Sequence, residues 1–354
     1  MQNKPIKVAI DISPLQTGHS VRGVGYYVEN LQKALVKYGT NEYVFFTKTE
    51  QIPKDADIVH YTYFDPFYIN LPKNSNAKTI VTVHDLIPII FPSHFPAGVK
   101  GKIKWQIQKR RLRKINHVIT VSNCSKNDVN KYTGIKEENI SVIYLSAAEQ
   151  FRRNKEGKWI AEIRNKYNLP ENFVLYVGDA TWNKNLPQLI NAVVKLDIPL
   201  VLVGKSLTQK NIDIKNLWNR DLLLSQALIK ENKNLHSFGY VETEDLVKIY
   251  NLATLFIMPS YYEGFGLPVL EALNCGCPVI CSKKGSLPEI AGDAALYVDP
   301  DDIDNILESI KRLYSNKNLQ NQLRDKGFKQ AHKFSWEKTA QQTILVYQKL
   351  INDK

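Results

Sequence analysis

Two glutamates and two glycines lie close together around the start of a predicted helix. Glu263 and Glu271 stand eight positions apart around Gly264-Phe265-Gly266. Glycines let backbone N–H groups approach a ligand closely, and a helix start favours anionic groups such as a diphosphate. Because carboxylates repel phosphate, we expect the glutamates to accept hydrogen bonds from sugar hydroxyls instead. The pattern therefore predicts a nucleotide-sugar as ligand rather than a free nucleotide.

A second interpretation of this motif is equally compatible with the residues alone. An ordinary helix start also carries an acidic side chain in its first turn, where it stabilises the helix dipole. A lone Glu-Gly-x-Gly supports that interpretation at least as well as a ligand site. The neighbouring segments therefore have to decide between them.

Short β-rich runs alternate with amphipathic segments of helix length along the whole chain, which is typical of parallel sheets with helical crossovers. A length of 354 residues favours two domains, so we expect an α/β fold with two doubly wound, Rossmann-like units. The predicted strands are near Lys7–Ile12, Tyr43–Phe46, Ile58–Tyr61, Thr79–Val83, Val118–Val121, Val142–Tyr144, Val174–Val177, Leu200–Val203, Leu235–Phe238, Leu255–Met258, Val279–Cys281 and Ala295–Val298. We expect the domains to be 1–168 and 169–335, with an amphipathic helix at 336–354 that packs back on the first domain.

Other candidate ligand residues follow predicted strands, where α/β folds bind ligands. Lys184 and His84 each come shortly after a strand, and Gly23 and Gly25 form a loop after the first one. Each has an alternative interpretation: a solvated lysine, a structural histidine and an incomplete dinucleotide fingerprint.

The chain resembles the retaining glycosyltransferases of family 4, which have the GT-B fold. The resemblance rests on segments in the order of that family: RGVGYYVENL, TVHDLIPIIFP, VITVSNCSKND, YVGDATWNKNLPQLINA, SYYEGFGLPVLEALNCGCPVI and GSLPEIAGDAALYVDP. It implies a GT-B architecture, in which two Rossmann-like domains face each other across a cleft.

The resemblance also implies roles for individual residues. Glu263 and His84 are similar to the residues that face the donor sugar, and they are the candidate catalytic residues. The implied donor-binding residues are Gly23, Gly25, Lys184, Gly264, Phe265, Gly266, Leu267 and Glu271, with Glu271 on the ribose and Lys184 on the diphosphate. The sequence departs from the family where an arginine usually joins that lysine, because positions 179–183 are Asp-Ala-Thr-Trp-Asn.

The implied activity is transfer of a hexose of the mannose, glucose or N-acetylhexosamine class from a nucleoside-diphosphate sugar. The acceptor would be a saccharide or lipid-linked saccharide in polysaccharide or lipopolysaccharide assembly. No cofactor or metal is expected, since Asp55-Ala56-Asp57 and Asp299-Pro300-Asp301 fit structural roles better than metal binding. The alternatives are a degenerate nucleotide-sugar-binding protein without turnover and a GT-B sugar-nucleotide epimerase. A phosphorylase would need a pyridoxal-phosphate lysine, for which the chain has no matching context.

The net charge of +12 lies entirely in residues 1–170, which hold 26 Lys/Arg against 14 Asp/Glu. No acidic residue occurs between Asp85 and Asp128. Apolar residues at helical spacing predict an amphipathic helix over 99–119 with a cationic face. This helix would either attract an anionic membrane surface or be solvated on its own sheet. No nucleic-acid recognition motif accompanies the charge.

The cysteines and the first residues limit the cellular setting. Cys124, Cys275, Cys277 and Cys281 are expected to be buried free thiols, because no histidine lies near the C-x-C-x3-C spacing to complete a zinc site. Residues 1–5 leave no room for a signal peptide before the first strand, and no apolar run approaches the roughly 20 residues that span a bilayer. We expect a cytoplasmic protein that is peripheral to the membrane if the basic helix binds lipid.

Overall fold

The computed structural model describes residues 5–352 except 19, 21, 22, 74 and 156. Arg22 of the first resemblance segment, residues 1–4 of the signal-peptide argument and residues 353–354 of the predicted last helix lie outside the described residues. The chain divides into two compact units, Met1–Ser146 with Phe334–Lys354 and Ala147–Lys333. Each unit is described by itself.

Within the described residues, unit 1 contains a parallel six-stranded sheet in the order β2-β1-β3-β4-β5-β6. Its strands are β1 (Lys7–Asp11), β2 (Glu42–Phe46), β3 (Ile58–Tyr61), β4 (Lys78–Val83), β5 (His117–Thr120) and β6 (Ile140–Val142). β3 and β5 are buried throughout, which is why they read as continuous apolar-rich runs and not as alternating ones.

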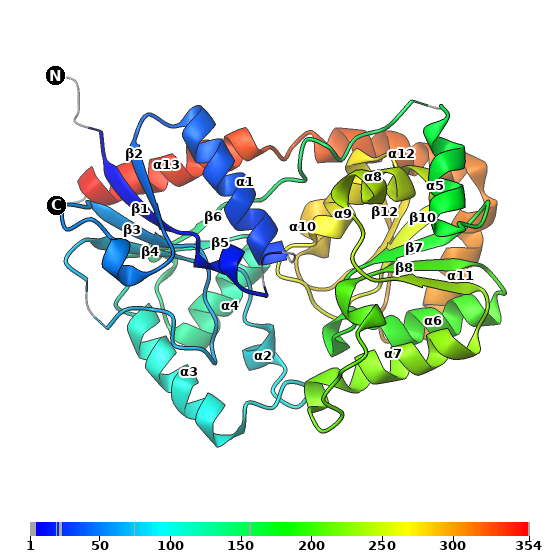
Figure 1. The fold of residues 1–354 in the computed structure, drawn as a ribbon, viewed down its shortest axis with the longest axis horizontal. Helices are drawn as coiled ribbons and strands as arrows, with labels where there is room; N and C mark the ends of the chain where they lie inside the picture. Colours follow the sequence, from blue (N-terminus) through cyan, green and yellow to red (C-terminus); the bar gives the residue numbers. More distant parts are fainter. Residues whose placement is uncertain (1–4, 19, 21–22, 74, 156, 353–354) are drawn as a thin grey trace. The chain divides into compact units, whose positions relative to one another are not determined.

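Helices cover both faces of this sheet (Figure 1). The helices of unit 1 are α1 (Gly23–Tyr38), α2 (Ile87–Ile90), α3 (Gly98–Leu112), α4 (Asn123–Thr133) and α13 (Trp336–Asn352), with 3-10 turns η1 (Ser13–Gln16), η2 (Thr49–Gln51) and η3 (Glu137–Asn139). α1 and α13 pack side by side on one face, although the whole of unit 2 separates them along the chain. Leu112 of α3 and Val129 of α4 join the apolar core on the opposite face.

Unit 2 repeats the architecture with a parallel sheet in the order β12-β11-β10-β7-β8-β9. Its strands are β7 (Val174–Val177), β8 (Leu200–Val203), β9 (Leu235–Phe238), β10 (Leu255–Met258), β11 (Val279–Ser282) and β12 (Ala295–Val298). Its helices are α5 (Trp159–Tyr167), α6 (Leu186–Lys195), α7 (Arg220–Glu231), α8 (Thr243–Leu252), α9 (Leu267–Asn274), α10 (Leu287–Ala291), α11 (Ile303–Ser315) and α12 (Lys317–Ala331), with 3-10 turns η4 (Trp182–Lys184), η5 (Lys205–Thr208) and η6 (Leu217–Asn219). α6, α7 and α11 cover one face, and α8, α9 and α10 cover the other (Figure 1).

The division between the units falls earlier than the sequence predicts. It lies between Ser146 and Ala147 instead of 168 and 169. The polar segment that suggested a linker belongs to unit 2, because α5 packs on α8 and the backbone N–H of Asn154 donates to Asn251 at 2.8 Å. Polarity in this segment reflects an exposed helix face and not a joint.

The predicted helix over 99–119 is too long at its C-terminal end. α3 ends at Leu112, and Ile119 belongs to β5. The predicted apolar stripe also divides, because Leu112 is fully buried whereas Val99 and Ile103 are 76% and 56% exposed.

The four cysteines are free thiols, and Cys275, Cys277 and Cys281 are buried as predicted, while Cys124 is half-buried. Among the described residues, no helix combines the length and the apolar character that crossing a bilayer requires.

Candidate active site

β7 and β10 are neighbours in the sheet of unit 2, although β8 and β9 lie between them in the sequence. The strand order reverses at this pair, so the loops after β7 and β10 open at a topological switch point, where α/β folds bind ligands. Lys184 lies on the first loop and Glu263 on the second. The sheet therefore brings together two charged residues that are 79 positions apart.

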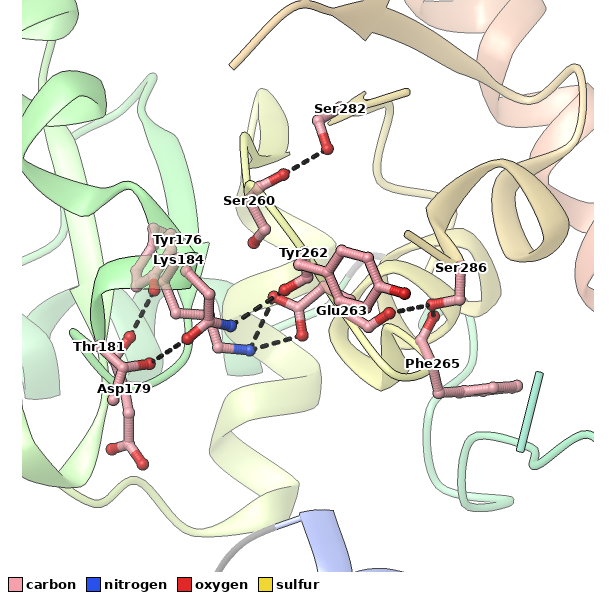
Figure 2. A network of polar contacts seen from close by, with 11 residues as sticks. Tyr176, Asp179, Thr181, Lys184, Ser260, Tyr262, Glu263, Phe265, Ser282 and Ser286 are labelled. Carbon is pink, nitrogen blue, oxygen red and sulfur yellow. Dashed lines mark hydrogen bonds and ion pairs between the residues drawn. The ribbon is translucent and has the colours of Figure 1, made fainter. Parts of the chain in front are cut away.

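The ammonium of Lys184 forms an ion pair with the carboxylate of Glu263 (Figure 2). The Lys184 Nζ lies 2.8 Å from Oε1 and 2.8 Å from Oε2. The two side chains are only 19% and 8% exposed, so the charges neutralise each other at small separation in partly desolvated surroundings. The interpretation of Lys184 as a solvated surface lysine is thus wrong.

Asparagines on either side of Lys184 join the two loops. Asn183 donates from Nδ2 to the carbonyl of Tyr262 at 3.0 Å, and its own carbonyl accepts from the backbone N–H of Tyr261 at 2.7 Å. Asn185 donates to the carbonyl of Pro259 at 3.2 Å. These bonds hold the backbone on both sides of the ion pair.

A third loop, which follows β11, supports the backbone of Glu263. The Ser286 hydroxyl lies 3.0 Å from the Glu263 carbonyl and 2.7 Å from that of Phe265 (Figure 2). Gly285 adopts a φ of 60°, and a Cβ there would lie 2.8 Å from the Glu263 backbone nitrogen. Only glycine fits both the conformation and the contact.

Gly266 lies where the loop that carries Glu263 leads into α9. Its φ of 106° is left-handed, and an added Cβ would lie 2.7 Å from a methyl of Leu287. As the N-cap it has no side chain to cover the first-turn amides, and Leu267 begins the helix directly after it. The positive end of the α9 dipole therefore favours an anion beside the buried Gly264-Phe265 segment.

Glu271 has different surroundings from Glu263. It is buried on α9, where Oε2 accepts a hydrogen bond of 3.0 Å from the Tyr250 hydroxyl. Burial raises the pKa of Glu271 from 4.5 to about 7, although the bond from Tyr250 acts in the opposite direction. One glutamate is thus held by a cation and the other by a neutral phenol, and ribose binding by Glu271 stays a prediction.

His84 lies at the end of β4 in unit 1, and several groups fix its position. Its Nε2–H donates to the carbonyl of Thr62 at 3.1 Å, and the Ser125 hydroxyl donates to the His84 carbonyl at 2.8 Å. The ring of Tyr27 packs edge-on against the imidazole, with centroids 4.8 Å apart.

Gly23 and Gly25 lie close to Tyr27 in the chain, but not in the loop that the sequence predicts. They form the first turn of α1. The absence of a third glycine fits this outcome, because a helix start does not need the complete fingerprint.

The sequence did not single out Asn183, Gly285 or Ser286, which hold the loop that carries Glu263. Asn183 was visible only as part of a matching segment. Gly285-Ser286 begins the matching segment GSLPEIAGDAALYVDP, comes shortly after β11 and precedes the Leu287-Pro288 helix start, so the segment and its place after a strand were the available signals.

Comparison with known proteins identifies the family of this chain. The family described as "Glycosyl transferases group 1" matches residues 160–330, and "Glycosyltransferase Family 4" matches residues 48–146. O-antigen chain mannosyltransferase B of Escherichia coli is 30% identical over 304 residues, which cover 83% of this chain and 76% of that protein. The chain belongs to the group 1 glycosyltransferases of family 4. It is a glycosyltransferase, as the resemblance predicts.

For two further relatives, the match covers a smaller share of the relative's own length. The MMP alpha-(1->4)-mannosyltransferase of Mycolicibacterium hassiacum is 29% identical, over 70% of this chain and 57% of that protein. The serotype-specific mannosyltransferase WbdA of Escherichia coli is 27% identical over 81% of this chain, which spans only 35% of WbdA.

Solved structures share the fold of this glycosyltransferase. A sucrose-phosphate synthase from Thermosynechococcus elongatus superposes with a TM-score of 0.75 at 21% identity, covering 99% of this chain and 100% of that one. Anabaena HepE in complex with UDP and glucose gives a TM-score of 0.72 at 15% identity, with coverage of 97% and 99%. The predicted fold class, α/β of the GT-B type with two doubly wound sheets, is confirmed.

The ion pair leads to a prediction for Glu263→Gln. The amide no longer balances the Lys184 charge, so the ammonium is fully available to a diphosphate. We expect the affinity for UDP or GDP, measured by titration calorimetry, to rise about 3- to 10-fold while sugar transfer falls on the order of 100-fold. Glu308→Gln, on the exposed side of α11, is the matched control and should change neither quantity. A parallel loss of diphosphate affinity and transfer would contradict this division of roles.

A second prediction concerns Glu271 and the pH dependence of stability. Because the folded-state pKa of about 7 lies above the ordinary value of 4.5, the folded protein retains a proton that the unfolded chain releases between these values. The free energy of unfolding therefore falls as pH rises from about 4.5 to about 7 and then levels off.

Glu271→Gln removes this dependence while keeping an acceptor for Tyr250. We expect the variant to exceed the original protein in stability at pH 8, by on the order of 2–3 kcal/mol, and to match it near pH 4. Urea denaturation at both pH values measures the difference, and Glu308→Gln again serves as the control. Equal stability differences at the two pH values would show that the Glu271 pKa is not raised.

Proposed function

We propose that this glycosyltransferase moves a hexose, with mannose as the first candidate, from a nucleoside-diphosphate sugar to a saccharide or lipid-linked saccharide. The product would be part of a surface polysaccharide or lipopolysaccharide, formed with retained configuration at the anomeric carbon. The names of the relatives in Escherichia coli and Mycolicibacterium hassiacum support mannose. The Lys184–Glu263 pair at the switch point of unit 2 is the observation that carries the proposal.

This pair suits a ligand in which a diphosphate is bonded to a sugar. An ammonium has three N–H donors, and the carboxylate of Glu263 takes two of them. The third can reach a phosphate oxygen, so one lysine contacts both the protein carboxylate and the diphosphate. Since the anomeric carbon is bonded to the terminal phosphate, Glu263 then lies beside the sugar and can accept a hydrogen bond from one of its hydroxyls.

The transfer step needs no nucleophile from the protein. The bond between the anomeric carbon and the phosphate oxygen breaks, and the acceptor oxygen bonds to that carbon on the same face. The acceptor proton passes to the leaving phosphate, which departs as part of the nucleoside diphosphate. Lys184 and the α9 start stabilise the charge that develops on this leaving group, while Glu263 and His84 orient the sugar.

We also propose that the transfer requires no divalent metal. The two Asp-x-Asp segments have structural partners: Asp57 accepts from the backbone N–H of Lys7 at 2.8 Å, and Asp299 accepts from that of Asp301 at 3.1 Å. Positive charge from Lys184 and the helix start takes the place of a metal at the diphosphate.

A panel of sugar nucleotides tests the donor. We expect GDP-mannose to raise the melting temperature and to be hydrolysed slowly, and to do both more than UDP-glucose or UDP-N-acetylglucosamine. Hydrolysis should continue in the presence of EDTA. Stabilisation without hydrolysis or transfer would favour the alternative of a binding protein without turnover. Activity that is lost with EDTA and restored by Mg²⁺ would contradict metal independence.

The partner surface that we propose on unit 1 is an anionic membrane. Val99 and Ile103 are one turn apart on α3 and largely exposed, and the neighbouring Lys100, Lys102 and Lys104 are exposed as well. Apolar side chains beside lysines suit a surface that lies at the boundary between headgroups and acyl chains.

A loop that is hydrogen-bonded to α3 has further exposed apolar side chains. Tyr68 is 65% exposed and Ile69 is also exposed. Gln108 of α3 fixes this loop, because its side-chain amide nitrogen Nε2 donates to the carbonyl of Tyr68 at 2.8 Å and to Asn70 Oδ1 at 2.5 Å. These hydrogen bonds join the loop to α3.

Co-sedimentation with vesicles tests the membrane surface. We expect binding to phosphatidylglycerol-containing vesicles at low salt, weaker binding at high salt, and none to purely zwitterionic vesicles. The double variant Val99→Ser, Ile103→Ser should bind about 10-fold more weakly. Val36→Ser with Leu345→Ser removes equally exposed apolar groups from α1 and α13 and is the matched control. No binding of the original protein at low salt would exclude the membrane proposal.

A further inference from the structure

Four buried polar side chains form a continuous chain of hydrogen bonds through unit 1. The Tyr347 hydroxyl of α13 lies 2.7 Å from His60 Nδ1 of β3. His60 Nε2 lies 2.8 Å from Thr82 Oγ1 of β4, which in turn lies 3.0 Å from the Tyr27 hydroxyl of α1. Each of these side chains is at most 2% exposed, so four elements share one polar path inside an apolar core.

The histidine in this hydrogen-bonded path is neutral. Burial, and then the neighbouring charge of His84, lower the pKa of His60 to about 3. A neutral imidazole has one N–H and one acceptor nitrogen, and the two phenols and the threonine can orient their hydroxyls to match either tautomer. Every contact in the path can therefore be a hydrogen bond, which is the condition under which a buried network fixes a single geometry.

The path ends at the candidate catalytic histidine. The Tyr27 ring stands at 81° to the His84 imidazole, with centroids 4.8 Å apart. The hydroxyl of the same ring is the group that Thr82 holds. The ring and hydroxyl of Tyr27 form one rigid group that turns about only two χ angles. A hydrogen bond that fixes the hydroxyl therefore also fixes where the ring contacts His84.

We propose that Tyr27 is a positioning residue for His84 and that Tyr347 acts on His84 through His60, Thr82 and Tyr27. The inference rests on the proposed role of His84 in orienting the donor sugar. In this proposal α13, the last described helix, helps to position the His84 imidazole. A path that only stabilised the fold would leave the imidazole geometry and the rate of transfer unchanged in folded variants.

Tyr27→Phe and Tyr347→Phe test the proposal, since both keep the ring and remove the hydroxyl. We expect each to lower kcat with GDP-mannose, or with whichever sugar nucleotide of the panel is turned over, by about 10-fold and to change the donor KM by less than twofold. In a His84→Ala background neither substitution should lower kcat further, because both act through the missing imidazole. Losses that multiply with that of His84→Ala would overturn the proposal.

A spectroscopic measurement separates this proposal from the proposed function. In protein labelled with ¹⁵N-histidine, His84→Ala identifies the His84 imidazole signals, and Tyr347→Phe should shift them. Leu112→Ala, a buried substitution on the opposite face of the same sheet, is the control and should leave these signals in place. Unshifted His84 signals in folded Tyr347→Phe protein would overturn the positioning role even if transfer were observed. Shifted signals would support it even if GDP-mannose were not the donor.

Discussion

The short double contact between Lys184 and Glu263 is the constraint on which the structure of the donor site depends. A carboxylate and an ammonium that are both largely removed from water are stable only while they remain together. Their backbones must therefore be held within narrow limits, and the surrounding loops do this with uncharged groups. Asn183 fixes one side, Ser286 the other, and Gly285 allows the backbones to approach. The site is a charged pair enclosed by a neutral frame.

Unit 1 holds His84 by contacts of a different kind. Its buried polar path contains no charge, because His60 is neutral at all but very acidic pH. Neutral hydrogen bonds cost less to desolvate than ions, and so they can run deep between two helices and a sheet. The two units thus share one architecture, but the Lys184–Glu263 site of unit 2 contains an ion pair, whereas the polar path of unit 1 consists of uncharged hydrogen bonds.

The sequence predicts much of the fold, for reasons that particular residues illustrate. Val174–Val177 and Leu255–Met258 agree with the structure at both ends, since a strand buried on both faces reads as an uninterrupted apolar run. The start of α9 was predictable from Pro268. The end of α3 was not, because Ile115 and Ile119 continue a helical spacing by coincidence after the helix has ended at Leu112. Likewise, Glu263 and Lys184 were each recognised, but their pairing depends on β10 lying beside β7, which neither local spacing nor polarity encodes.

The hydrogen bond between His60 and Tyr347 joins residues 287 positions apart, and it spans the entire sequence of unit 2. During synthesis on a ribosome, unit 2 has all of its residues as soon as position 333 has emerged, whereas unit 1 still lacks α13. Until α13 is made, one face of the unit 1 sheet is incompletely covered and His60 Nδ1 lacks the Tyr347 hydroxyl. Unit 1 can therefore be completed only after all residues of unit 2 have been made, which reverses the usual N-to-C order of domain folding.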